Sequence, residues 1–141
     1  MIAPLALQVT DQLVEIFGED VRVLELPAHA DERGRLVELD FSLVPFEVRR
    51  AFTVAGARAG TIRGGHRHRA VEHLLSCVAG SVEVELRRGN ASAVITLEPD
   101  SGHSLYLAAG VWSSQRYLEV GSTLLVLASE PFDPAGYDSG Y

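Results

Sequence analysis

The chain has 141 residues, 47% of them hydrophobic, which is enough for a single domain around one compact core. Its formal net charge is −7, so the overall field repels nucleic acid and anionic membrane surfaces. No apolar run is long enough to span a bilayer, and the N-terminus lacks the basic segment of a signal peptide. We therefore expect a cytoplasmic protein with a single domain over residues 1–141 and with neither a nucleic-acid nor a membrane partner.

Both ends of the chain are predicted to lie outside the main fold. Residues 1–20 form an expected N-terminal extension, in which Thr10 is a suitable N-cap and Gly18 a suitable stop for a short helix over Asp11–Phe17. Residues 130–141 are rich in proline, glycine and acid, so we expect an irregular tail along the surface.

Between these ends, short β-rich runs alternate with turn residues. The predicted strands are VRVLEL (21–26), RLVELDF (35–41), VRRAFTV (48–54), HLLSCV (73–78), SVEVELR (81–87), AVITL (93–97), SLYL (104–107), QRYLEV (115–120) and TLLVLAS (123–129). Within 81–87, apolar and polar side chains alternate, and Gly89 with Asn90 is expected to supply the positive φ angles of a hairpin turn. Short strands with no helical stretch between them predict an all-β sandwich or barrel.

The stretch 60–80 carries three of the five histidines of the chain. His66 and His68 are two residues apart, so an extended strand would present both imidazoles on one face. Together with His73 and the flanking glycines, their spacing resembles the first cupin motif, with a histidine in place of its usual glutamate. Residues 102–113 match the second cupin motif in spacing. Two motifs in order favour a cupin fold, the double-stranded β-helix or jelly roll.

All twelve basic residues are arginines, and half of them crowd around the histidine motif. These six are Arg49, Arg50, Arg58, Arg63, Arg67 and Arg69. Because the planar guanidinium pairs with phosphate oxygens in a bidentate manner, the cluster is a candidate anion site within an acidic chain. The use of arginine without lysine has a second explanation in a GC-rich genome.

Longer stretches resemble the sugar-nucleotide 3,4-ketoisomerases, a family of cupin enzymes. They are ERGRLVEL, PFEVRRAFTV, RGGHRHRAVEHLLSCVAGSVEVEL, GVWSSQ and VLASEPFDPAGY. The resemblance covers nearly all of the chain after about Val21, and its most specific parts are Arg63–His68 and Val126–Tyr137. It implies an isomerase acting on dTDP-4-keto-6-deoxyglucose in bacterial deoxysugar biosynthesis, often for antibiotic biosynthesis. It also implies a homodimer that uses no metal and no organic cofactor.

Three positions depart from the pattern of this family. Phe52 stands where some members have tyrosine, which removes a hydroxyl from a potential sugar contact. His73 stands where glutamine is usual, and Ser113 stands where some members have histidine. The histidine at position 73 reopens the question of a metal.

The implied reaction moves a ketone from C4 to C3 through an enediol, so its chemistry is proton transfer. An imidazole suits both directions, because its unperturbed pKa of about 6.5 lies near operating pH. From the resemblance we expect His68 to remove the carbon-bound proton and His66 to move protons between the oxygens. The residues expected to bind or orient the substrate are Arg33, Arg50, Arg63, Glu72, His73 and Trp112. For Glu72, a surface carboxylate is an equally good interpretation. For Trp112, the sequence favours a ring in the core or the cavity wall over a specific contact with the substrate, although a thymine base would be able to stack on it.

Three other functions stay open at this stage. The first is a metal-binding cupin with His66, His68 and His73 as ligands to iron, manganese, nickel or zinc. Ser113 argues against it, because it removes the usual fourth ligand. The second is a sugar-nucleotide epimerase, and the third is a non-catalytic sugar-binding cupin.

Overall fold

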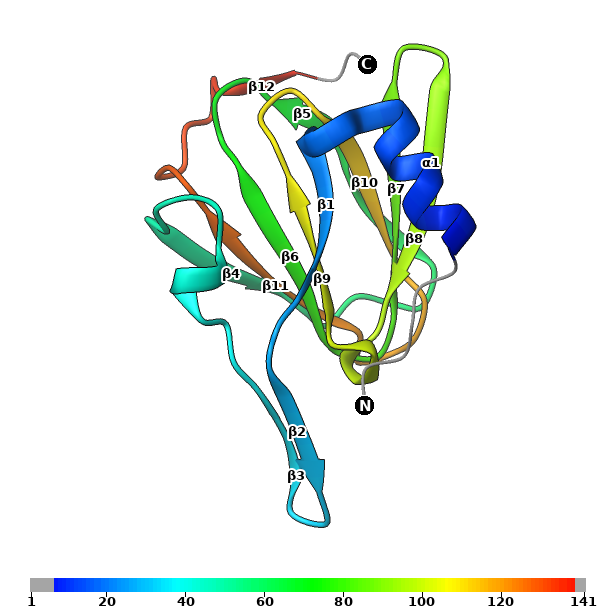
Figure 1. Cartoon of the computed structure of the whole chain (residues 1–141), viewed down its shortest axis with the longest axis vertical. Coiled ribbons are helices and arrows are strands. Elements are labelled where there is room, and N and C mark those ends of the chain that lie inside the picture. Colours follow the sequence, from blue (N-terminus) through cyan, green and yellow to red (C-terminus); the bar gives the residue numbers. More distant parts are fainter. Residues whose placement is uncertain (1–6, 139–141) are drawn as a thin grey trace.

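The computed structural model describes residues 7–138, and this described part begins with a helix. Helix α1 (Leu7–Phe17) packs beside β1 and β8, and the 3-10 turn η1 (Gly18–Asp20) follows it (Figure 1). The predicted helix is confirmed, but it starts before Asp11, so Thr10 lies inside it and not at its N-cap. No helix in the described range is long and apolar enough to cross a membrane.

The rest of residues 7–138 is built from twelve short strands. They are β1 (Val21–Glu25), β2 (Ala28–Asp31), β3 (Gly34–Val37), β4 (Arg50–Val54), β5 (Thr61–His68), β6 (His73–Ala79), β7 (Val82–Arg88), β8 (Ala91–Leu97), β9 (His103–Leu107), β10 (Trp112–Tyr117), β11 (Thr123–Ala128) and β12 (Tyr137–Asp138). Two further 3-10 turns are η2 (Phe41–Leu43) and η3 (Pro99–Ser101). Each of the nine predicted runs overlaps one of these strands, but the prediction omitted β2 and β12.

Ten of these strands form two five-stranded antiparallel sheets that face each other. One sheet has the order β1-β9-β6-β11-β4 and the other the order β12-β5-β10-β7-β8. Strands far apart in the sequence are therefore neighbours, as where β6 lies between β9 and β11 (Figure 1). This is the jelly-roll arrangement that the sequence predicts.

The main core lies between the two sheets and follows from the alternation of side chains along the strands. In β7, Val82, Val84 and Leu86 have no exposed surface, whereas the charged residues between them remain partly exposed. Each buried side chain of this size contributes about 1.5–3 kcal/mol to folding. The hairpin after β7 turns through Gly89 with φ of 59°. No non-glycine residue in the described range has a positive φ, so the expected role of Asn90 is wrong.

A second, smaller core covers the outer face of the first sheet. Its buried members are Leu26, Val44, Leu74, Tyr106 and Leu127, and the segment after β3 lies over them. The strand predicted over 35–41 ends at Val37, because Asp40 accepts a hydrogen bond from the Ser42 amide and starts η2. Strands β2 and β3 form a separate hairpin that extends away from the body (Figure 1).

The C-terminal segment departs from its prediction as an irregular tail. Tyr137 and Asp138 form the two-residue strand β12, which pairs with His68 and Arg67 at the end of β5. The segment is thus attached to the strand that carries the histidine pair. Residues 139–141, including Tyr141, lie outside the described range.

Candidate active site

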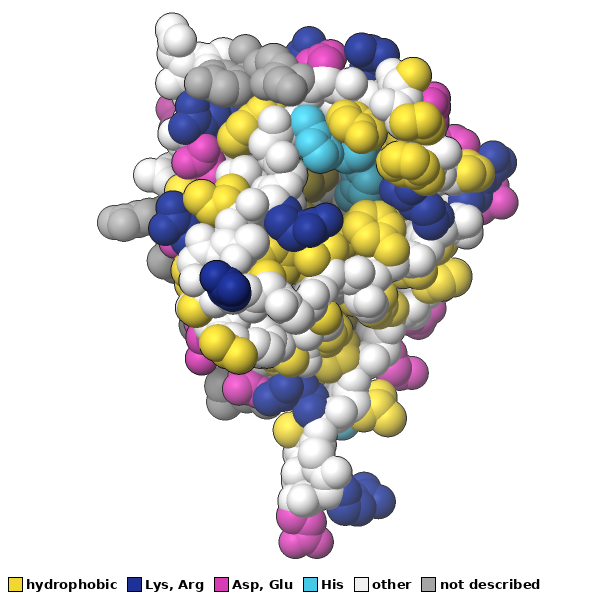
Figure 2. Space-filling model, turned by 180° about the vertical axis from the view of Figure 1, so that it is seen from behind, with side chains coloured by type: hydrophobic (Ala, Val, Ile, Leu, Met, Phe, Trp, Pro, Cys, Tyr) yellow, Lys and Arg dark blue, Asp and Glu magenta, His cyan; other side chains and the backbone are white. Residues whose placement is uncertain are grey.

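A cavity of about 420 Å³ opens between the two sheets, at the end where β12 lies across β5. Its walls come from β4, β5, β6, β10 and β11 and from the C-terminal segment. Figure 2 shows histidine side chains inside this hollow, with hydrophobic side chains and arginines around its mouth. The cavity is therefore lined by histidines and arginines of the stretch that the sequence analysis singles out.

The floor of the cavity holds three imidazoles in contact with one another. His66 and His68 share one face of β5, as predicted, with ring centroids 4.9 Å apart. His73 enters from β6 and lies 4.3 Å from the ring of His68. It is only 6% exposed, whereas the other two are half-buried. The three rings form a continuous row from the buried end of the site towards its opening.

The electrostatic environment keeps two of these imidazoles neutral. Burial, followed by the nearby His66 and Arg50, lowers the pKa of His68 from 6.5 to about 4. Burial, with His68 and Arg50 adding to it, lowers the pKa of His73 to about 3. Both rings therefore have a free nitrogen lone pair near pH 7 and are able to accept a proton.

A β-bulge brings Arg63 to the same side as the histidines. Arg63 and His66 are three positions apart, so on a regular strand they would point to opposite faces. The pairing of β5 with β10 jumps from His66 to Gly64, which leaves Gly65 as the extra residue of a bulge. Both glycines have positive φ, and a Cβ on Gly64 would lie 2.6 Å from the Gln115 side chain. The glycines therefore make the bulge possible, and Arg63 lines the cavity.

Arg50 stands at the opposite wall, between two aromatic rings. Its guanidinium carbon lies 4.8 Å from the centre of the Phe52 ring and 5.6 Å from that of Phe132. The Nε atom is buried and has no hydrogen-bond partner among the described residues. A buried, unpaired donor of this kind is expected to bind a ligand group.

Strand β10 contributes a polar wall that the sequence analysis missed. Ser113, Gln115 and Tyr117 line the cavity at every second position. The Gln115 amide donates to the Ser113 hydroxyl over 2.9 Å, and burial raises the pKa of the Tyr117 phenol. The predicted strand began at Gln115, two positions too late to include Ser113 in this face.

Tyr137 is a further lining residue that the sequence analysis missed. It belongs to the segment 130–141 that was predicted to be an irregular surface tail, but it lines the cavity. Its ring stacks on His66 with 4.6 Å between centroids and 29° between planes. The sequence did contain a signal for this role, because Tyr137 is the last residue of the stretch VLASEPFDPAGY, which carries part of the family resemblance.

Three of the predicted substrate-binding residues are not brought to this cavity. Arg33 lies on the tip of the β2–β3 hairpin. Glu72 accepts a hydrogen bond from the Tyr106 hydroxyl, in the second core on the outer face of the sheet. Trp112 lies on the face of β10 turned away from the cavity, where the Arg87 guanidinium lies 5.4 Å from its ring. The geometry supports Arg50, Arg63 and His73 as lining residues.

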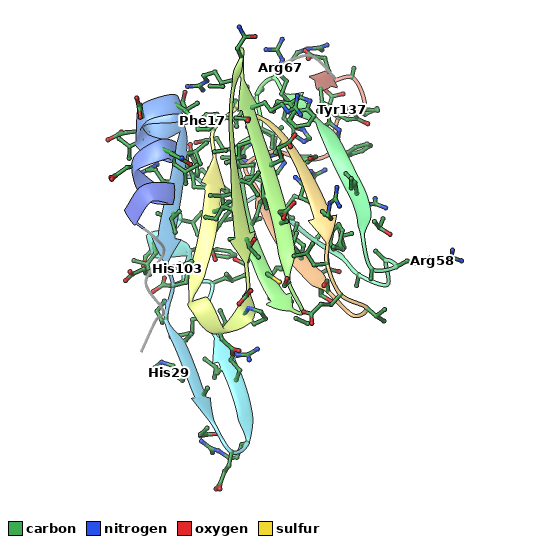
Figure 3. The ribbon with its side chains drawn as sticks, turned by 90° about the vertical axis from the view of Figure 1, so that its right-hand side faces the viewer. Phe17, His29, Arg58, Arg67, His103 and Tyr137 are labelled. Carbon is green, nitrogen blue, oxygen red and sulfur yellow. The ribbon has the colours of Figure 1, made fainter. Side chains whose placement is uncertain are left out.

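The predicted arginine cluster is divided by the fold. Of its six members, only Arg50 and Arg63 line the cavity. Arg58 points away from the body, whereas Arg67 lies beside Tyr137 (Figure 3). Arg67 and Arg69 contact the C-terminal segment. An anion held in the cavity therefore meets two arginines from this chain.

The three histidines do not form a metal-binding cluster. Within residues 7–138, no group of three or more histidine, cysteine, aspartate or glutamate side chains is arranged to hold a metal ion. The Ser113 hydroxyl, at the position of the usual fourth cupin ligand, accepts from Gln115. This geometry gives the metal-binding alternative no ligand set.

Comparison with known proteins identifies what this architecture resembles. The family model described as FdtA: WxcM-like, C-terminal matches residues 19–141. The TDP-4-oxo-6-deoxy-alpha-D-glucose-3,4-oxoisomerase of Aneurinibacillus thermoaerophilus is 31% identical over 122 residues, covering 85% of this chain and 86% of the relative.

Two solved structures combine the same fold with similar sequence. A variant of the QdtA 3,4-ketoisomerase from Thermoanaerobacterium thermosaccharolyticum, in complex with TDP, superposes with a TM-score of 0.80 at 30% identity. The match covers 86% of this chain and 88% of that one. The WlaRB TDP-quinovose 3,4-ketoisomerase from Campylobacter jejuni gives 0.78 at 31% identity, over 87% and 95% of the two chains.

Proposed function

The chain belongs to the FdtA family, and from this premise and the geometry of its cavity we propose that it is a TDP-4-keto-6-deoxyglucose 3,4-ketoisomerase. The observation that carries the proposal is the pair of histidines that share one face of β5 inside a cavity lined by two arginines. The named relatives act on TDP-linked sugars as 3,4-ketoisomerases, and their similarity covers most of this chain. The product is a TDP-linked 3-keto-6-deoxyhexose for deoxysugar biosynthesis.

The proposed mechanism needs two proton movements. Neutral His68 removes the proton from C3, and the electron pair of that bond forms the C3–C4 double bond of an enediolate, with the charge on O4. His66 gives a proton to O4, which converts the enediolate into the enediol. Delivery of a proton to C4, as His66 takes the proton from the C3 hydroxyl, then forms the C3 carbonyl and leaves a hydroxyl at C4. Each proton taken up by an imidazole is released again within one turnover.

The groups around the histidines suit the charges that develop. Arg63 lines the same side of the cavity as His66 and is positioned to stabilise the enediolate. Arg50 offers a buried Nε donor that has no partner within the described range, and we assign it to the diphosphate. Because proton transfer and charge stabilisation are sufficient for the reaction, we propose that it uses neither a metal nor an organic cofactor.

The comparisons favour this function over the other three. The three relatives described above are all named 3,4-ketoisomerases or an oxoisomerase, so epimerisation and binding without catalysis lack an observation in their favour. The metal-binding alternative also lacks a ligand set.

We further propose that the enzyme is a homodimer and that Arg33 acts across the interface. The β2–β3 hairpin carries Arg33 away from the cavity of its own chain, with Leu36 56% exposed beside it. A hairpin that projects from the body and exposes Leu36 offers a contact surface to a second subunit. In a dimer, Arg33 would reach a substrate held by the partner subunit. Light scattering on the purified protein tests the dimer by measuring its mass in solution.

We also propose that the enzyme is located in the cytoplasm.

The direct test is turnover in deuterated water. Purified, chelator-treated protein is incubated with TDP-4-keto-6-deoxyglucose, and the sugar is followed by proton NMR. We expect a 3-keto product with deuterium at C4. Inversion of a ring carbon with the ketone still at C4 would instead indicate an epimerase, and turnover that appears only after a divalent metal is added would indicate the metal-binding alternative.

A further inference from the structure

The sequence His66–Arg69 serves two parts of the molecule at once. Its residues alternate between imidazole and guanidinium, so on strand β5 the two kinds of side chain point to opposite faces. His66 and His68 line the cavity, whereas Arg67 and Arg69 contact the C-terminal segment. The two arginines therefore hold the C-terminal segment and take no direct part in the reaction.

The C-terminal segment is held by several contacts over a few residues. Arg67 Nε donates to Asp138 Oδ1 over 2.9 Å. Arg69 donates from its Nη1 to the Ala135 carbonyl over 2.6 Å and from its amide to the Gly136 carbonyl over 2.9 Å. The bonded residues Ala135, Gly136 and Asp138 flank Tyr137, so these hydrogen bonds fix the backbone of Tyr137 from both sides.

A turn just before these contacts sets the direction of the segment. The Asp133 carboxylate accepts from the Ala135 amide, and the Asp133 carbonyl accepts from the Gly136 amide, each over 3.0 Å. A Cβ on Gly136 would lie 3.2 Å from the Asp133 carbonyl, so this position has little room for a side chain. The chain therefore leaves the turn already directed along β5.

Tyr137 uses this fixed backbone to contact both catalytic candidates. It pairs with His68 in the ladder between β12 and β5. Its ring lies stacked on His66, 4.6 Å away, and tilted against His68, 5.5 Å away. His66 is half-buried at the open end of the row, so the tyrosine ring covers a face that the protein interior leaves open.

We propose that Tyr137 is a positioning residue, whose ring holds the His66 imidazole in its working orientation while Arg67 and Arg69 hold the ring in place. The inference rests on the proposed function. The physical reason is that proton transfer needs a donor and acceptor in near hydrogen-bond geometry, and a displacement of about 1 Å reduces a rate by about 10²-fold. An imidazole without a packed neighbour rotates about its side-chain bonds and occupies that geometry for only part of the time.

The first test removes the ring and then restores it. In Tyr137→Ala we expect kcat to fall about 10- to 100-fold, whereas the Kd for TDP alone, measured by calorimetry, stays within about twofold, because Tyr137 acts on the imidazole and not on the nucleotide handle. Tyr137→Phe keeps the stacked ring and is expected to recover most of the loss. Equal losses in both variants would overturn the proposal, because the hydroxyl and not the ring would then be required.

The second test loosens the segment from a distance. Arg67→Gln removes the ionic contact with Asp138 without touching the cavity, and we expect a smaller loss of kcat in the same direction. Its matched control is Arg116→Gln on the neighbouring strand β10, where the arginine forms an ion pair with Glu83 at 4.0 Å, away from the C-terminal segment. The double variant Arg67→Gln with Tyr137→Ala should lose no more than Tyr137→Ala alone, since both changes act through one ring.

A spectroscopic readout separates positioning from general destabilisation. A stacked tyrosine shifts the NMR signals of the His66 ring protons, and these shifts should disappear in Tyr137→Ala, weaken in Arg67→Gln and persist in Arg116→Gln. If wild-type protein gives no 3-keto product, the proposed function fails. If wild-type protein turns over and Tyr137→Ala keeps its kcat, the function stands and the role of Tyr137 is refuted.

Discussion

Glu72 and His73 are neighbours in the chain, but they lie on opposite faces of the first sheet and in opposite environments. On the outer face, Glu72 accepts from the Tyr106 hydroxyl, and the Arg22 guanidinium lies 4.6 Å from the centre of the Tyr106 ring. On the inner face, His73 is buried against His68, and its pKa is about 3. The Glu72–Tyr106 pair on the outer face is thus satisfied within the protein, whereas the imidazoles and Arg50 on the inner face line the cavity, where a ligand is able to reach them. The predictions below test this contrast between a structural and a chemical face.

The largest effect is expected for His68→Asn on the cavity face. It removes the proposed base and keeps a side chain of similar size, so activity should fall about 10²- to 10⁴-fold. Turnover is measured by NMR, and circular dichroism checks that the fold is retained. A variant that keeps wild-type turnover would show that another group removes the C3 proton.

A second change on the cavity face is Arg50→Met, which keeps a long side chain and removes the unpaired donor. A hydrogen bond to a charged group contributes about 1.5–3 kcal/mol, so the Kd for TDP should rise about 10- to 100-fold. Arg58→Met is the matched control, because Arg58 points away from the body (Figure 3). Equal affinities for Arg50→Met and wild type would place the diphosphate elsewhere.

The buried histidine predicts how stability depends on pH. The pKa of His73 is about 3 in the folded protein and about 6.5 when unfolded. Between these values the unfolded chain binds a proton that the folded chain does not, so stability falls as the pH is lowered from about 6.5 towards 3. His73→Gln removes one such group. Its melting temperature should therefore fall less steeply over this range than that of wild type, and identical slopes would refute the assignment.

The smallest effect on activity is expected on the outer face. Tyr106→Phe removes the hydroxyl and leaves the Glu72 carboxylate without this donor, so stability should fall by about 1–3 kcal/mol. Turnover should stay within about twofold, because neither group lines the cavity. Urea unfolding measures the first quantity and NMR turnover the second. A fall in turnover at unchanged stability would mean that the outer face takes part in the reaction.

Much of this fold was predictable because strand structure repeats every two residues. The alternation in β7, the shared face of His66 and His68, and the two cupin motifs are local patterns, and the structure confirms the all-β jelly roll that they predict. The two-residue repeat also explains why Trp112 and Glu72 do not line the cavity. Both were included among the expected site residues with the family resemblance, but each directly precedes a residue that lines the cavity, and adjacent residues of a strand point to opposite faces.

The sequence by itself determined the strands, the histidine pair and the resemblance to a ketoisomerase, because these depend on side-chain types and short spacings. The tertiary structure alone decided which groups meet in the cavity. The bulge at Gly65 turns Arg63 towards His66, and the two residues of β12 carry Tyr137 onto the histidines. Both depend on the register between distant strands, which is set by packing across the whole molecule and leaves no period in the local sequence.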